Sequence, residues 1–190
     1  MQKKSIFMVI MIFVFVLGGC GQSGKDKNAE YGEVIAGLGD DDQYALEDIG
    51  EKEDVLFTTD STYDDGQGHH AALYSNIYYI FDGKACELGR VESMGTAYPI
   101  SYGKRCIYTA SEHTLEIYVI DLSHQQLVLK EQYETVFGDT DQVSYRLVKN
   151  GIEETVSEED YQKVYEQYQQ STVINFGYGA SSCKTSKFTG

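Results

Sequence analysis

The stretch HAALYSNIYYIFDGKACELGRVESMGTAYPISYGKRCIYTASEHTLEIYVI, residues His70 to Ile120, contains the strongest signals for the fold of this chain. It consists of short apolar runs separated by turn-forming residues, of which Asp82-Gly83 is the clearest pair. A type I′ turn needs positive φ at both central residues, and Asp-Gly between two apolar runs is a strong signal for such a turn. The stretch therefore predicts an antiparallel meander.

The same pattern continues after this stretch. Apolar residues alternate in segments 115–119, 127–129 and 143–147, and Asn150-Gly151 is a second hairpin signal. We therefore predict a mainly β (α+β) fold built on an antiparallel meander of about nine strands. The sequence leaves open whether the meander forms a barrel, a sandwich or an open curled sheet.

One amphipathic helix is expected after the meander. The segment SEED at 157–160 is typical of a capping box, because the serine oxygen accepts a free N–H and the acids suit the positive helix end. An apolar stripe with helical spacing follows, formed by Tyr161, Val164, Tyr165 and Tyr168. We expect this helix to pack on the sheet. We also expect a short helix over Ala29–Ala36 and a last strand over Thr172–Phe176.

The N-terminus has the features of a secretory leader. Lys3 and Lys4 precede an apolar core from Ile6 to Leu17, which suits a signal peptide and is shorter than the ~20 residues of a membrane-spanning helix. The segment LGGC at 17–20 resembles the bacterial lipobox. The resemblance implies that Cys20 receives a diacylglyceryl group and becomes the mature N-terminus. The alternative is an ordinary secretory signal followed by a chance cysteine.

These signals divide the chain into four parts. Residues 1–19 are the expected signal peptide, and residues 20–28, which are small and polar, are the expected lipid-anchored tether. Residues 29–176 are the expected single β-rich domain, and residues 177–190 a flexible Gly/Ser-rich tail. The expected location is extracytoplasmic, on the outer face of the cell membrane, with the membrane as a partner through the lipid on Cys20.

The charge excludes one class of partner. The chain has a formal net charge of −15, and loss of Lys3 and Lys4 with the leader makes it −17. A field of this sign repels phosphate backbones, so we expect no nucleic-acid partner. No cofactor is expected either, because the chain lacks a P-loop, a G-x-G-x-x-G after a strand and a C-x-x-C motif.

Several short segments resemble a family of uncharacterised lipoproteins of Gram-positive bacteria. The matching segments occur in the family's order over residues 44–176: YALEDI, YYIFDGKACELG, GTAYPISYG and VKNGIEETVSEEDYQKVYEQY. The resemblance implies a β-meander with a C-terminal helix and an envelope location. It implies no chemistry, because the family has no established activity.

The family pattern also implies a calcium loop, of the form D-x-D-x-D-G, directly after the first matching segment. This chain keeps Asp48 but has Gly50 and Lys52 at the next two ligand positions. Calcium needs six to eight oxygen ligands, and an ammonium group at a ligand position repels the ion. We therefore expect no metal at this loop.

The segment DSTYDDGQGHH at 60–70 is the most chemically suggestive one. Asp64, Asp65, His69 and His70 bring carboxylates and imidazoles close together in the sequence. Their spacing does not fit an EF-hand loop. The segment predicts either an ordinary polar hairpin loop, since such loops are rich in Asp and Gly, or the site of an envelope hydrolase or metal-binding protein.

The cysteines leave two alternatives open. With Cys20 lipidated, Cys86, Cys106 and Cys183 remain in a compartment where disulfides persist. Cys86 and Cys106 lie in nearby expected strands and are the disulfide candidates. Free thiols are the alternative, because the number is odd and a domain of this length needs no covalent cross-link. Whether Cys183 is free cannot be derived from the sequence.

No catalytic residue is assigned from the sequence. The lipid anchor, the sixteen tyrosines and the absence of a recognisable catalytic motif favour a membrane-anchored binding or interaction module of the cell envelope. Its ligand would be an envelope protein or a glycan. The alternative is the hydrolase or metal-binding protein that uses the 60–70 loop.

Overall fold

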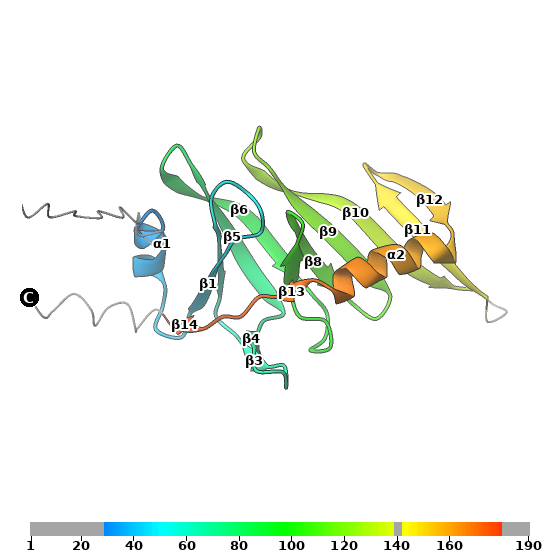
Figure 1. Ribbon diagram of the computed structural model, residues 1–190, viewed down its shortest axis with the longest axis horizontal. Coiled ribbons are helices and arrows are strands. Elements are labelled where there is room, and N and C mark those ends of the chain that lie inside the picture. Colours follow the sequence, from blue (N-terminus) through cyan, green and yellow to red (C-terminus); the bar gives the residue numbers. More distant parts are fainter. Residues whose placement is uncertain (1–28, 139–141, 180–190) are drawn as a thin grey trace, which may run out of the picture.

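The computed structural model describes residues 29–138 and 142–179, which form fourteen strands and two helices (Figure 1). In chain order these are α1 (Gly32–Gly37), β1 (Gln43–Glu47), β2 (Val55–Thr59), β3 (Tyr63–Asp64), β4 (His70–Ala71), β5 (Tyr74–Phe81), β6 (Lys84–Glu92), β7 (Ser101–Gly103), β8 (Cys106–Ala110), β9 (Thr114–Asp121), β10 (Gln126–Phe137), β11 (Val143–Lys149), β12 (Ile152–Val156), α2 (Glu158–Gln169), β13 (Thr172–Val173) and β14 (Tyr178–Gly179). Nine of these strands have five or more residues and the other five have two or three, so the mainly β fold with one C-terminal helix is confirmed.

The strands form two larger antiparallel sheets and a small hairpin. Sheet 1 has the order β14-β1-β2-β5-β6, and sheet 2 has the order β12-β11-β10-β9-β8-β7-β13. From β7 to β12 each strand pairs with the next strand in the chain, which is the predicted meander. The hairpin of β3 and β4 stands apart from both sheets. Figure 1 shows an elongated molecule with α1 at one end and β11 and β12 at the other.

The two-residue turns form where the sequence predicted them. Asp82 and Gly83 have φ values of 50° and 76°, and Asn150 and Gly151 have φ values of 55° and 75°. Positive φ at both central residues matches the right-handed twist of the flanking strands. The turn between β7 and β8 also has positive φ at both central residues, although Lys104 and Arg105 occupy it.

Sheet 1 is covered on both faces, which explains why all of β2 is buried. Its inner face meets sheet 2 in one apolar cluster, and its outer face packs on α1 in another. Phe57 points inward and its neighbour Leu56 outward, and both are fully buried. Successive strand residues point to opposite faces, so a strand that is apolar throughout needs partners on both sides.

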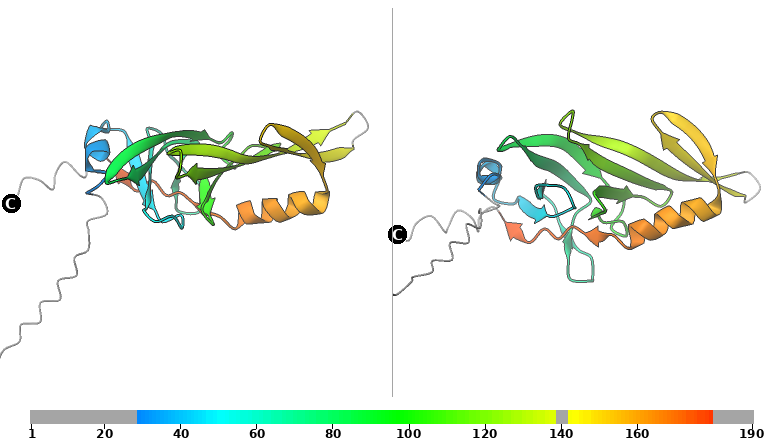
Figure 2. Two further views of the ribbon diagram at one scale, coloured as in Figure 1. Left: turned by 90° about the horizontal axis from the view of Figure 1, so that it is seen from above. Right: turned by 45° about the horizontal axis from the view of Figure 1, so that its top comes forward.

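Helix α2 covers the face of sheet 2 that is turned away from sheet 1 (Figure 2). The Oγ of Ser157 accepts a hydrogen bond from the backbone N–H of Asp160 at 3.1 Å, as the capping box predicted. Tyr161, Val164 and Tyr168 pack against Tyr108 and other residues of this face. The expected role of the helix as a cover of the sheet is therefore confirmed.

The C-terminal segment differs from the expected single strand over Thr172–Phe176. It pairs with sheet 2 through β13, then buries Ile174 and Phe176 completely in the cluster between the sheets, and finally pairs with β1 through β14. Tyr178 and Gly179, the first part of the predicted tail, thus still pair with sheet 1. The rest of the predicted tail and the leader lie outside the described residues.

Candidate functional site

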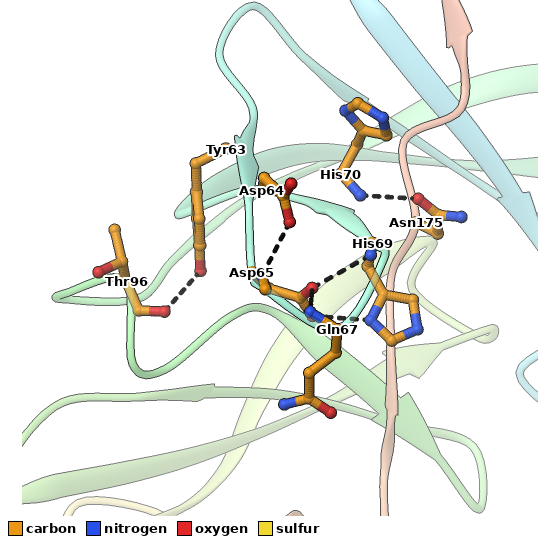
Figure 3. A network of polar contacts seen from close by, with 9 residues as sticks. Tyr63, Asp64, Asp65, Gln67, His69, His70, Thr96 and Asn175 are labelled. Carbon is orange, nitrogen blue, oxygen red and sulfur yellow. Dashed lines mark hydrogen bonds and ion pairs between the residues drawn. The ribbon is translucent and has the colours of Figure 1, made fainter.

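The hairpin of β3 and β4 holds the polar residues that the sequence singled out. Asp65 Oδ2 lies 2.7 Å from His69 Nδ1, and Asp65 Oδ1 accepts hydrogen bonds from the backbone N–H groups of Gln67 at 2.8 Å and His69 at 3.1 Å (Figure 3). The Asp65 side chain is only 5% exposed. Its burial favours the neutral acid, but these hydrogen bonds outweigh burial and lower the pKa of Asp65 to about 2.

The other two residues of the expected site do not join this pair. Asp64 Oδ1 accepts a hydrogen bond from the backbone N–H of Gly66 at 2.8 Å, an Asx turn that shapes the tip of the hairpin. The ring of His70 points away from Asp65 and His69 (Figure 3). The hairpin therefore contains one Asp–His pair and no convergence of all four side chains.

The hairpin is anchored to the rest of the molecule through its backbone and one phenol. The backbone N–H of His70 donates to Asn175 Oδ1 at 2.9 Å, and the carbonyl of His70 accepts from the N–H of Phe176 at 2.9 Å. The hydroxyl of Tyr63 donates to the carbonyl of Thr96 at 3.1 Å. These contacts account for the hairpin's position by ordinary structural hydrogen bonds.

A second Asp–His pair, which the sequence reasoning missed, lies in the turn between β9 and β10. Asp121 Oδ2 lies 2.7 Å from His124 Nδ1, and Asp121 Oδ1 accepts from Ser123 Oγ at 2.5 Å. In a Ser-His-Asp triad the serine contacts Nε2 of the histidine and the aspartate contacts Nδ1. Here Ser123 Oγ also lies near Nδ1, at 3.0 Å, and donates to the carboxylate, so the serine is held in place and not activated.

The tyrosines of α2 form a continuous row of ring contacts with sheet 2. Tyr161 stacks on Tyr145 with 4.4 Å between ring centroids, and Tyr165 lies 6.1 Å from Tyr161. Tyr168 continues the row and contacts Tyr108 at 6.3 Å. These rings pack between the helix and the sheet, which gives a structural role to several of the tyrosines.

The disulfide candidates are separate in the structure, which agrees with the alternative of free thiols. Cys86 and Cys106 are both free thiols. Cys86 lies in β6 of sheet 1, whereas Cys106 lies in β8 and packs in the cluster beneath α2. The sequence predicted that they lie in nearby strands, but the chain changes sheets between β6 and β7. Cys20 and Cys183 lie outside the described residues.

The loop that the family resemblance associates with calcium is closed by protein groups. Asp48 Oδ1 accepts from the backbone N–H of Gly50 at 2.9 Å. Glu51, whose side chain is 4% exposed, accepts two hydrogen bonds from Arg105 of the β7–β8 turn. Lys52 extends into solvent and contacts Glu53 at 3.2 Å. The guanidinium of Arg105 thus supplies the positive charge at this loop.

A cavity of about 190 Å³ lies where the chain leaves sheet 1 and meets sheet 2. The backbone N–H of Met94, just after β6, donates to the carbonyl of Ala110 at 2.9 Å, and the N–H of Ala110 donates to Ser93 Oγ at 3.1 Å. Glu92 lines the cavity from the sheet 1 side and Glu116 lines it from sheet 2. This cavity has no local signal in the sequence, because its lining comes from four strands and their connections.

Glu116 is held in a defined orientation. Its Oε2 accepts hydrogen bonds from Thr109 Oγ1 at 2.9 Å and from the hydroxyl of Tyr118 at 2.8 Å. Burial, followed by the interaction with Glu116, raises the pKa of Tyr118, so the phenol remains a donor. Thr109 is 1% exposed, which makes its hydroxyl a fixed donor. A carboxylate held in this way needs little reorganisation to bind a donor group.

Comparisons with known proteins identify no relative. No protein-family model matches the chain, and no curated protein or solved structure matches it. Over residues 29–138 and 142–179, neither helix is long and apolar enough to cross a membrane. The resemblance to Gram-positive lipoproteins therefore stays a prediction from the sequence.

Proposed function

We propose that this chain is a lipid-anchored binding module of the cell envelope, and that its ligand is an envelope protein or a glycan. The observation that carries the choice of binding over hydrolysis is the geometry of the β3–β4 hairpin. Asp65 and His69 bind each other, whereas Asp64 accepts a hydrogen bond from the backbone N–H of Gly66. The ring of His70 points away from the Asp65–His69 pair (Figure 3). A hydrolytic site needs its acid, base and nucleophile around one position for the reacting atom.

The proposed anchor is the diacylglyceryl group on Cys20. Two acyl chains hold a protein on a membrane stably, whereas one chain gives only marginal binding. The tether of residues 20–28 would join the anchor to α1, which lies at the opposite end of the molecule from β11 and β12 (Figure 1). In this arrangement sheet 2 is the part of the domain that extends away from the membrane.

The anchor is tested by Cys20→Ala with Cys86→Ala as the matched control. We expect Cys20→Ala to remain an uncleaved precursor, because lipidation precedes cleavage at a lipobox, whereas Cys86→Ala should be processed like the unchanged chain. Metabolic labelling with a fatty acid and membrane fractionation measure both properties. A Cys20→Ala chain that is processed normally and released into the medium would show that the leader is an ordinary secretory signal.

Binding is distinguished from hydrolysis by incubating the chain lacking its leader with purified envelope material. We expect envelope components to be retained on the immobilised chain without the release of new soluble fragments. His69→Ala should leave this retention unchanged, since the Asp65–His69 pair is structural. Release of fragments that His69→Ala abolishes would instead establish the hydrolase alternative.

A further inference from the structure

We propose that the cavity between Glu92 and Glu116 binds an alkylammonium group, carried either by a lysine side chain of a partner polypeptide or by a free amine. This inference rests on the proposed binding function and names the chemistry of the ligand. Most of the cavity's lining comes from strands of sheet 2, and Glu92 at the end of β6 contributes from sheet 1. Such a junction is a common position for a ligand site.

Among the described residues, Glu116 accepts hydrogen bonds through only one of its two carboxylate oxygens. Both donors that reach this carboxylate, Thr109 and Tyr118, bind the same oxygen, Oε2. Within residues 29–138 and 142–179, no hydrogen bond to the other oxygen, Oε1, is present. A carboxylate has about four acceptor positions, so a fixed carboxylate with one empty oxygen at a cavity suits an additional charged donor.

The charged residues that line the cavity are all acidic. Glu92 supplies a second carboxylate, and the lining contains no lysine, arginine or histidine. The nearest described counter-charge on Glu92 is Arg90, at 3.6 Å, and the side chains of both are at least half exposed. Gln132 donates its amide to Glu134 at 2.6 Å, which leaves its carbonyl as a further acceptor on the wall. An ammonium group has three donors and no acceptor, which matches this lining.

The size of the cavity and its apolar wall residues also suit an alkylammonium group. A volume of about 190 Å³ is large enough for an ammonium group on a short carbon chain. Ala110 and the exposed side chain of Met94 offer apolar contacts for that chain. A calcium ion fits less well, because it takes six to eight oxygens, and the described residues contain no group of three acidic, histidine or cysteine ligands.

The test uses the full chain in a non-ionic detergent and n-butylamine as the probe. Two-dimensional amide NMR spectra should show saturable shifts at Ala110, Thr114 and Glu116. n-Butanol and butyrate have a similar carbon chain without the positive charge, and neither should produce these shifts. Equal shifts with n-butanol, or no shift with n-butylamine, would overturn the proposal.

The variants test the carboxylates. Glu116→Gln should weaken n-butylamine binding by about tenfold or more, because it removes the charge and keeps an acceptor for Thr109 and Tyr118. Glu92→Gln, at an exposed position where folding is not at risk, should also weaken binding. The matched control is Glu112→Gln, a nearby glutamate that is 82% exposed and outside the lining, which should bind n-butylamine as before. An unchanged affinity in both Glu116→Gln and Glu92→Gln would refute the site.

A second probe separates the two sources of the ammonium group. Nα-acetyl-lysine N-methylamide presents the same group on a peptide backbone. If it binds as tightly as n-butylamine, the cavity accepts a lysine of a polypeptide; if only n-butylamine binds, the ligand is a free amine. Failure of both probes would remove the ammonium site and leave the anchoring test of Cys20→Ala unaffected. Release of the Cys20→Ala chain into the medium would refute the lipid anchor and would leave the amine-binding proposal unaffected.

Discussion

The guanidinium of Arg105 binds the carboxylate of Glu51 through two hydrogen bonds, Nε–Oε1 at 2.9 Å and Nη2–Oε2 at 2.6 Å. Arg105 lies in the turn between β7 and β8 of sheet 2, and Glu51 in the loop between β1 and β2 of sheet 1. The backbone N–H of Arg105 also donates to the carbonyl of Ile49 at 2.9 Å. The pair therefore fastens the two sheets to each other at their margin.

A double-mutant cycle of Arg105→Ala and Glu51→Ala should show a favourable coupling energy in the free energy of unfolding. The reason is that Glu51 is almost fully buried and a two-point guanidinium contact is lost when either partner is removed. The matched cycle uses Lys52 and Glu53, an exposed pair in the same loop, for which we expect almost no coupling. Urea unfolding measures both; similar coupling in the two cycles would contradict the prediction.

The melting temperature should be the same in EDTA and in about 1 mM Ca²⁺. A site with micromolar affinity would add roughly 4 kcal/mol at this concentration and would be readily detected. Lys52 occupies a position at which the D-x-D-x-D-G pattern has a calcium ligand, and Arg105 already neutralises Glu51. A calcium-dependent rise of several degrees that Asp48→Ala abolishes would show that the loop binds the ion after all.

Asp65 should contribute stability that is present at neutral pH and lost in acid. Its pKa is about 2 in the folded chain and about 3.9 in an unfolded one. A carboxyl group with a lowered folded-state pKa stabilises the fold above the unfolded-state value, and the contribution declines as the pH falls from about 4 to about 2.

His69→Ala should therefore raise the pKa of Asp65, since it removes the ring contact at 2.7 Å. Carboxyl ¹³C titration by NMR measures this change. His113→Ala is the control, because the ring of His113 pairs with the exposed Glu112 at 3.9 Å and has no contact with Asp65. If the pKa of Asp65 is the same in His69→Ala and in His113→Ala, the proposed cause of the shift is wrong.

Phe176→Ala should lower the free energy of unfolding by roughly 3–5 kcal/mol, the usual cost of removing a buried aromatic ring. Phe176 is 0% exposed and lies in the cluster between the two sheets. Phe137→Ala is the matched control, with a ring that is 59% exposed, and should change stability by no more than about 0.5 kcal/mol. Equal effects of the two substitutions would show that the C-terminal segment does not hold the sheets together.

Local structure could be predicted from short segments of the sequence. The turns at Asp82-Gly83 and Asn150-Gly151 form as predicted because the conformation of a two-residue turn depends mainly on its own residues. Ser157 caps α2, and the apolar stripe of that helix lies against sheet 2, because both features follow from spacing within a few residues. These local signals were sufficient for the fold class, with nine longer strands and one C-terminal helix.

The arrangement of these elements could not be predicted in the same way, because it depends on contacts between distant residues. The division of the meander into two sheets separates Cys86 from Cys106, brings Arg105 to Glu51, 54 positions away, and forms the cavity at Glu116. Alternating apolar residues specify which side of a strand is buried but not what buries it. Contacts between distant residues result from how the apolar faces pack together, and a single sequence carries no local signal for that choice.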